Sequence, residues 1–144
     1  MKKHLKILLV AICVLLLSTV VAVAISADST ISTDATFQSY QVATDGSVNL
    51  RFKYSSLGTA KEMVAEIYKP GASEPYATKE YAVADLEAEK AEKGNAAYIV
   101  SVPLSPDQMD DTVKVYAKDA DGNTGKVKAM SVSAYAWAIL NSES

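Results

Sequence analysis

Histidine and cysteine, the side chains that most often act as bases, nucleophiles and metal ligands, each occur only once in this chain of 144 residues. Both His4 and Cys13 lie near the N-terminus. The rest of the chain therefore lacks the residues for a Ser-His-Asp or Cys-His arrangement and for a zinc site built on His or Cys. It also contains no glycine-rich phosphate loop. The sequence predicts a protein that is not an enzyme and needs no cofactor.

Paired carboxylates are the catalytic arrangement that these absences leave open, because any two acids can meet in space. The acidic residues of this chain lie mostly in predicted turns and in the stretch Asp85–Glu92. Carboxylates in such solvated places keep ordinary pKa values, which are too low for a general acid near neutral pH. A small hydrolase with a carboxylate pair is therefore the second alternative function.

Asp119, Asp121 and Asn123 place oxygen ligands at alternate positions, as at the start of a calcium-binding loop. The sixth position of such a loop would be Thr124 instead of glycine, and the twelfth would be Met130 instead of a bidentate glutamate. The same acidic and amide residues tolerate the left-handed backbone of a hairpin turn. We expect a turn without a metal, and a weak calcium site at these three residues is the alternative.

Outward-facing aromatic and basic residues are the remaining candidates for binding. Exposed tyrosines and the single tryptophan could stack on sugars, but tyrosines that line a core edge with their hydroxyls in solvent are the favoured interpretation. Basic residues at outward strand positions could hold an anionic polymer, although a solvated surface that protects strand edges is favoured. These outward basic positions are Arg51, Lys53, Lys114, Lys118, Lys126 and Lys128. The candidate ligand-binding residues are Tyr68, Tyr116, Trp137, Lys114, Lys118 and Lys128.

The elements that must position these residues are short strands. Apolar residues alternate with polar ones from Val48 to Tyr54 and again from Thr112 to Lys118, which is the pattern of a half-buried strand. Turn residues separate such stretches every eight to twelve residues, as in an antiparallel β-sandwich. The other strands are expected at 37–42, 63–69, 76–83, 97–104 and 126–130, with the 76–83 strand at a sheet edge. The fold class is therefore all-β, with six or seven strands.

Two short helices are expected beside the strands. Asp85–Lys93 contains good helix formers, with Gly94 as a stop and Leu86 as its only sizeable apolar residue. Ala134–Leu140 forms a C-terminal helix, capped by Ser131 or Ser133. Its Tyr135, Ile139 and Leu140 share a stripe that should pack on the sandwich, so truncation after Met130 should unfold the protein. The predicted core is Leu50, Phe52, Ile67, Val100, Val102, Val113, Val115, Val127 and Ile139.

The N-terminus carries the pattern of an export signal. Lys2, Lys3 and Lys6 precede the apolar stretch Ile7–Ile25, and Ala22-Val23-Ala24 fits a cleavage site. We expect a signal peptide at residues 1–27, or an uncleaved membrane anchor at 7–25, a linker at 28–34 and a single domain at 35–144. The protein is then secreted or on the cell surface. The only charged side chains that the signal contains are basic. The chain that remains after cleavage is therefore more negatively charged than the whole chain, whose net charge is −3, and it is unsuited to binding nucleic acid.

A resemblance follows from the last third of the chain. Ser105-Pro-Asp-Gln-Met-Asp-Asp-Thr-Val, then Asp119-Ala-Asp-Gly-Asn, then Ser131-Val-Ser-Ala-Tyr-Ala-Trp-Ala-Ile-Leu resembles the C-terminal end of an Ig-like module. Such modules occur in uncharacterised secreted and surface proteins of clostridial-type Gram-positive bacteria. The resemblance implies an Ig-like sandwich and carries over no catalytic or binding residue.

The predicted function is a non-catalytic secreted or cell-surface interaction or structural module. A carbohydrate-binding module that uses exposed Tyr and Trp is the first alternative. The expected partner is a surface protein or a polysaccharide, with no nucleic acid. A membrane is contacted only through the N-terminal segment, if that segment is not cleaved.

Overall fold

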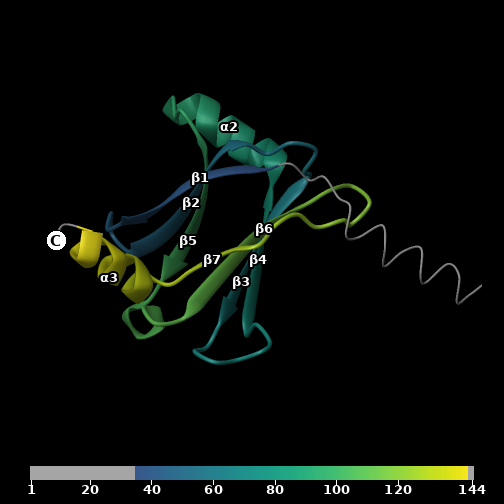
Figure 1. Ribbon diagram of the computed structural model, residues 1–144. Helices are drawn as coiled ribbons and strands as arrows, with labels where there is room; N and C mark the ends of the chain where they lie inside the picture. Colours follow the sequence, from purple (N-terminus) through teal and green to yellow (C-terminus); the bar gives the residue numbers. More distant parts are fainter. Residues whose placement is uncertain (1–34, 143–144) are drawn as a thin grey trace, which may run out of the picture. The chain divides into compact units, whose positions relative to one another are not determined.

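The computed structural model describes residues 35–142, which fold into two antiparallel β-sheets with seven strands and a short C-terminal helix (Figure 1). Ser32–Ser144 forms a compact unit of its own. The predicted signal peptide or anchor, residues 1–27, and the predicted linker, residues 28–34, lie outside the described residues. The described part of the chain therefore has the predicted all-β, sandwich-like architecture.

The first sheet has the strand order β1-β2-β5. Its strands are β1 (Thr36–Ala43), β2 (Val48–Ser56) and β5 (Tyr98–Leu104). Leu50 pairs with Val102 and Phe52 with Val100, so the apolar residues of β2 and β5 share one face. This confirms the predicted register of β2, because a slip of one residue would have turned Arg51 inward instead.

The second sheet has the strand order β4-β3-β6-β7. Its strands are β3 (Glu62–Tyr68), β4 (Ala77–Ala82), β6 (Thr112–Lys118) and β7 (Lys128–Met130). β4 is an edge strand, as predicted for the 76–83 stretch. Ala65 pairs with Val115 and Ile67 with Val113, which gives this sheet an apolar inner face.

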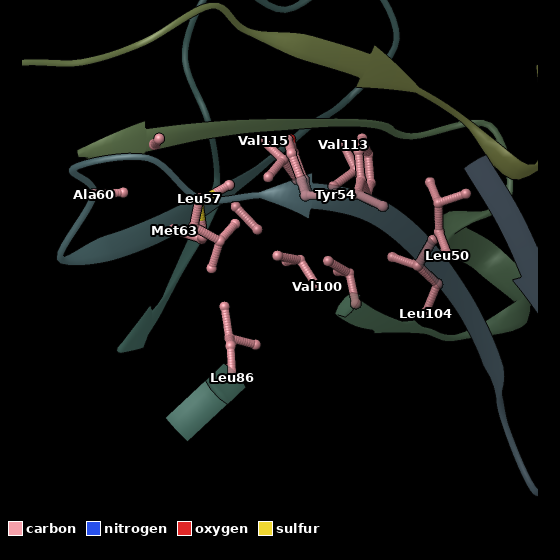
Figure 2. Packing of buried hydrophobic residues seen from close by; sticks show 14 residues of the cluster. Leu50, Tyr54, Leu57, Ala60, Met63, Leu86, Val100, Leu104, Val113 and Val115 are labelled. Carbon is pink, nitrogen blue, oxygen red and sulfur yellow. The ribbon is translucent and has the colours of Figure 1, made fainter. Parts of the chain in front are cut away.

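The core lies between the two sheets (Figure 2). Leu50 and Val100 of the first sheet and Met63, Val113 and Val115 of the second are fully buried there. The other buried members of this cluster are Phe52, Tyr54, Leu57, Ala60, Ala65, Leu86, Val102, Leu104 and Ala117. All predicted core residues in β2, β5 and β6 are buried, and Ile67 is partly buried against the cluster.

Tyrosine hydroxyls join the two sheets along both lateral edges. Tyr40 of β1 donates a hydrogen bond to the carbonyl oxygen of Ala129 in β7 at 3.3 Å. Tyr81 of β4 donates one to the carbonyl oxygen of Ser101 in β5 at 2.8 Å. These bonds place β1 beside β7 and β4 beside β5, so each edge strand of one sheet lies against an edge strand of the other.

The helix α2 (Val83–Lys93) follows β4 directly and packs on the sandwich through Leu86 and the partly buried Val83. Leu86 is buried, which agrees with the prediction of a short surface helix. Gly94 ends it in the left-handed conformation, with φ of 64°, which costs glycine little because it has no Cβ.

The strand β7 has the opposite register to the one predicted. Lys128 pairs with Val115 and Met130 with Val113, so Lys128 and Met130 point toward the first sheet. The prediction that Val127 belongs to the core and that Lys128 faces outward is therefore wrong. Val127 precedes the strand and is 52% exposed.

The turn after β6 explains this change of register. Asp119–Asn123 forms the predicted turn, and Thr124 bridges back to Lys118. The amide of Gly125 donates to the carbonyl of Ala117 at 2.8 Å, and regular pairing resumes only at Lys128. Because side chains alternate with period two, this irregular stretch decides which residues of β7 face inward.

The C-terminal helix α3 (Val132–Ser142) forms as predicted but does not bury the predicted stripe. The hydroxyl of Ser131 accepts a hydrogen bond from the amide of Ala134 at 3.1 Å and so caps the helix. Ile139 is 44% exposed and Leu140 is 75% exposed, so neither belongs to the core. The predicted unfolding on truncation after Met130 therefore loses most of its basis, since Val132 is the helix residue that packs against the core.

Candidate interaction surface

The outer face of the second sheet brings together four of the predicted ligand-binding residues. Tyr68 projects from β3, while Lys114, Tyr116 and Lys118 project from β6 at positions opposite in phase to the buried Val113 and Val115. Glu66 lies among them, because β3 and β6 pair Glu66 with Lys114. We name Glu66, Tyr68, Lys114, Tyr116 and Lys118 the Tyr–Lys face.

Glu66 is the centre of the hydrogen bonds on this face. The hydroxyl of Tyr68 donates to Glu66 Oε2 at 2.6 Å, and the hydroxyl of Tyr116 donates to Glu66 Oε1 at 3.0 Å. The two tyrosines lie on different strands, so the carboxylate ties β3 and β6 together through their side chains. A hydrogen bond to a charged acceptor is stronger than one between neutral groups.

The pKa values of both tyrosines follow from this arrangement. The hydrogen bond to Glu66 is the main cause that raises the pKa of Tyr68 above its ordinary value. Burial, followed by the hydrogen bond to Glu66, raises the pKa of Tyr116 to about 12. Both phenols therefore remain protonated donors at physiological pH.

The two lysines of the Tyr–Lys face have different partners. The Lys114 ammonium lies 4.2 Å from the centre of the Tyr68 ring, within the range of a cation–π interaction. The Lys118 ammonium lies 3.5 Å from a carboxylate oxygen of Glu62 and 3.9 Å from one of Glu80. The Lys118 ammonium is thus paired with carboxylates, whereas the Lys114 ammonium lies against an aromatic ring.

The Tyr–Lys face is closed rather than open to stacking. Tyr68 is buried beneath its neighbours, with Lys114 over its ring, and Val64 on the same side of β3 is also buried. A sugar ring needs an exposed aromatic face, so the geometry here disfavours Tyr68 as a carbohydrate platform. Glu66 was missed in the sequence, because its role depends on which strand pairs with β3, and alternation within one strand does not give that.

Trp137 and Lys128, the other two predicted ligand-binding residues, lie elsewhere. Trp137 is on α3 and is 69% exposed. Lys128 lies on the inner side of the edge strand β7, with its ammonium 5.0 Å from the centre of the Phe37 ring. Arg51 and Lys53 belong to the outer face of the first sheet. The basic residues are therefore divided between separate surfaces and do not form the single cationic face that an anionic polymer would need.

The Asp119 carboxylate faces the backbone of its own turn. Its Oδ1 accepts hydrogen bonds from the amides of Asp121 and Asn123, both at 2.9 Å, and its Oδ2 accepts one from Asn123 Nδ2 at 3.1 Å. Desolvation alone would raise the pKa of Asp119, but the bonds from Asn123 and Asp121 outweigh it and lower the pKa. The geometry is that of a hydrogen-bonded turn. Within residues 35–142 no three His, Cys, Asp or Glu side chains gather in a way that could hold a metal ion.

Comparison of the chain with family models, with curated proteins and with solved structures found no match. The resemblance to Ig-like modules thus stays a prediction from the residues. Among residues 35–142 no helix is both long enough and apolar enough to cross a membrane.

Asp111 marks a second polar cluster, at the end of the sandwich where β3 leads into β4. Its buried carboxylate accepts a hydrogen bond from Tyr76 and lies 3.1 Å from the Lys69 ammonium. Gln108 Nε2 in turn donates to the Tyr76 hydroxyl at 2.7 Å. These groups satisfy one another, so the cluster fixes the β3–β4 loop and offers no open site.

A polar groove of about 280 Å³ lies between α2 and the outer face of the first sheet. Asp45 and Glu89 are the two acids that line it. Asp45 pairs with Arg51 at 3.1 Å, and Glu89 pairs with Lys93 at 2.6 Å. Both carboxylates are thus engaged by cations, which gives no support to the carboxylate-pair hydrolase.

We expect the two tyrosines of the Tyr–Lys face to lose their protons at a higher pH than a free tyrosine does. A phenol whose pKa is raised in the folded state stabilises the protein below its unfolded pKa of about 10, and this contribution is lost as the pH rises toward the folded value. Absorbance of tyrosinate during an alkaline titration measures this. Replacing Glu66 by Gln removes the charged acceptor and should lower the pH at which Tyr68 and Tyr116 are half deprotonated. A titration curve unchanged by Glu66→Gln would contradict the arrangement.

Proposed function

We propose that this protein is a non-catalytic, exported interaction module that binds a surface protein or a polysaccharide through the Tyr–Lys face. The observation that carries the proposal is the fixed arrangement around Glu66. Tyr68 and Tyr116 are held by hydrogen bonds, and Lys114 is held over the Tyr68 ring. Side chains that are already ordered lose little conformational entropy when a partner binds, which favours affinity.

The chemistry of the Tyr–Lys face defines what a partner must offer. Both the Tyr68 and the Tyr116 hydroxyl donate to Glu66, and the less buried Tyr116 hydroxyl keeps lone pairs that accept further hydrogen bonds. Lys114 supplies three N–H donors and a positive charge. A partner therefore needs a hydrogen-bond donor opposite the Tyr116 phenol and a carboxylate or another acceptor opposite Lys114. Exposed protein loops supply such groups, and the hydroxyls of a neutral polysaccharide supply both donors and acceptors.

The strand order supports an Ig-like assignment of the sandwich. Ig constant-type domains place strands A, B, E and D in one sheet and C, F and G in the other. With β1 to β7 taken as A to G, the orders β1-β2-β5 and β4-β3-β6-β7 agree with this scheme in every strand except the fourth. Here β4 pairs with β3 instead of β5. Modules of this architecture are common on cell surfaces, in keeping with the proposed role.

Export is proposed from the sequence of the N-terminal segment. Three lysines, a long apolar stretch and an Ala-x-Ala site have the order of a secretory signal. The domain that follows contains no cysteine, so it does not rely on a disulfide, and its stability comes from the core between the sheets. The proposed location is extracellular, either released or held at the surface by residues 7–25.

Binding to the cells that produce the protein tests this proposal. The sandwich has a core of its own, so labelled Ser32–Ser144 is a suitable probe. Lys114→Glu places a like charge beside Glu66 and should weaken cell binding at least about ten-fold. Lys53→Glu is the matched control, because Lys53 is an equally half-buried lysine on the outer face of the opposite sheet. Equal binding by the two variants, or a loss confined to Lys53→Glu, would refute the proposal.

The labelled Ser32–Ser144 domain also distinguishes binding from catalysis. Incubation of the probe with isolated surface polysaccharide should produce no new reducing ends, because the acids Asp45 and Glu89 in the groove are held by cations. Steady release of reducing ends, abolished by Asp45→Asn or Glu89→Gln, would favour the hydrolase instead.

A further inference from the structure

The helix α3 presents an apolar ridge to solvent. No residue of Val132–Ser142 is charged. Trp137 is 69% exposed and Leu140 is 75% exposed, and their spacing of three residues places them side by side on the helix. A wide apolar surface on an uncharged helix is normally buried, so this exposed ridge lacks cover.

The ridge belongs to a fixed element and not to a loose tail. The Ser131 hydroxyl caps the helix, and the Ser133 hydroxyl donates to Asp110 Oδ1 at 2.6 Å. The Ser133 amide also donates to the Met109 carbonyl at 3.0 Å. Val132 packs against the core at the same end. The first turn of α3 is therefore anchored to the connection between β5 and β6, and the ridge is held in one orientation.

We propose that α3 is the contact through which two copies of this chain associate, with Trp137 and Leu140 of each copy packed against the α3 helix of the other. The pair is related by a two-fold axis, so each copy covers the ridge of its partner. The proposal concerns a surface other than the Tyr–Lys face and does not depend on the proposed function.

The charge distribution permits a second copy at this position. The chain has a net charge of −3, and residues 35–142 carry charged side chains on both sheets and on α2. Two copies of an acidic domain repel each other over most of their surfaces. The uncharged helix α3 is a place where they can meet without burying like charges. A membrane surface fits less well, because interfacial helices normally carry Lys or Arg beside their apolar residues.

The exposed area sets the strength of the association. The exposed parts of Trp137, Ile139 and Leu140 amount to roughly 400 Å² per copy if fully exposed side chains of this size present about 150–250 Å² each. Two copies together bury roughly 800 Å² through these residues alone, and the neighbouring alanines of α3 bring this close to the lower limit of about 1,000 Å² for a specific interface. We therefore expect a weak, concentration-dependent dimer.

Sedimentation of Ser32–Ser144 tests the dimer, and the single tryptophan of the chain reports on the same contact. Between about 5 μM and about 500 μM, a range suited to an interface near the lower size limit, the average mass should rise toward twice the monomer value. The Trp137 emission should shift to shorter wavelength over the same range, because the indole leaves water. Leu140→Glu should raise the dissociation constant at least about ten-fold by burying a charge at the contact.

Val127→Glu provides the matched control, since Val127 is also an exposed apolar residue but lies before β7, outside α3. Association by this variant as strong as that of the unmodified chain supports the proposal. A monomer at every concentration would overturn it, and so would association that Leu140→Glu leaves unchanged. A shift in Trp137 emission that requires added lipid vesicles or polysaccharide, without a rise in mass, would also overturn it.

Discussion

Replacing Leu50 by Ala is expected to lower the free energy of unfolding by about 2–5 kcal/mol. Leu50 is fully buried between the sheets, where it pairs across the strands with Val102. The substitution loses the free energy gained when the leucine side chain moves out of water. It also leaves a cavity that the close-packed neighbours fill only in part. The loss is a large share of the roughly 5–15 kcal/mol that stabilises a typical domain. Chemical denaturation of Ser32–Ser144 measures it.

Leu140→Ala makes the same chemical change at a position that is 75% exposed. At a concentration where the chain is monomeric, it should change the free energy of unfolding by no more than about 0.5 kcal/mol. This pair tests directly whether α3 belongs to the core. If Leu140→Ala destabilised the domain as much as Leu50→Ala, the predicted packing of the helix stripe on the sandwich would be right and the exposed ridge would be wrong.

Replacing Tyr54 by Phe is expected to stabilise the domain by roughly 1 kcal/mol, although it removes a polar group. The Tyr54 side chain is buried, and its hydroxyl has no hydrogen-bond partner among residues 35–142. Burial, together with the nearby Tyr40, raises the pKa of this phenol far above its ordinary value. The folded protein thus bears the cost of a desolvated hydroxyl, and phenylalanine keeps the ring contact with Phe37 without that cost.

Tyr81→Phe removes the same atom from a hydroxyl that does have a partner. Tyr81 donates to the Ser101 carbonyl and joins β4 to β5 across the edge of the sandwich. Its loss should lower the free energy of unfolding by about 0.5–1.5 kcal/mol. The two Tyr→Phe variants should therefore change the thermal midpoint in opposite directions. A destabilised Tyr54→Phe variant would show that the Tyr54 hydroxyl is satisfied in solution.

Alternation within each strand was enough to predict where most strands lie and which side of them is buried. Leu50 and Phe52 face inward and Arg51 and Lys53 outward because a single slip would expose the apolar side of β2 to water. The same reasoning failed at Val127. There the turn after β6 contains an irregular stretch whose length decides the phase of β7, and no pattern in three strand residues can reveal it.

For the Tyr–Lys face too, the local sequence predicts which residues point outward, but not which of them meet. Tyr68, Lys114, Tyr116 and Lys118 could be predicted as outward residues from their own strands. Their meeting on one surface depends on the pairing of β3 with β6, two strands more than 40 positions apart in the chain. Glu66 became the centre of the face for the same reason, because its two phenol partners come from both strands.

The sequence by itself determined the β-rich class, the short helices, the burial of the central strands and the scarcity of catalytic side chains, since these follow from composition and local period. Tertiary structure alone decided what depends on contacts between distant segments. It brought Glu66 between two tyrosines, turned Lys128 inward at an edge strand, and left Trp137 and Leu140 in solvent. In the last case the amphipathic pattern of α3 was real, but a helix buries an apolar stripe only where the rest of the fold provides a surface for it.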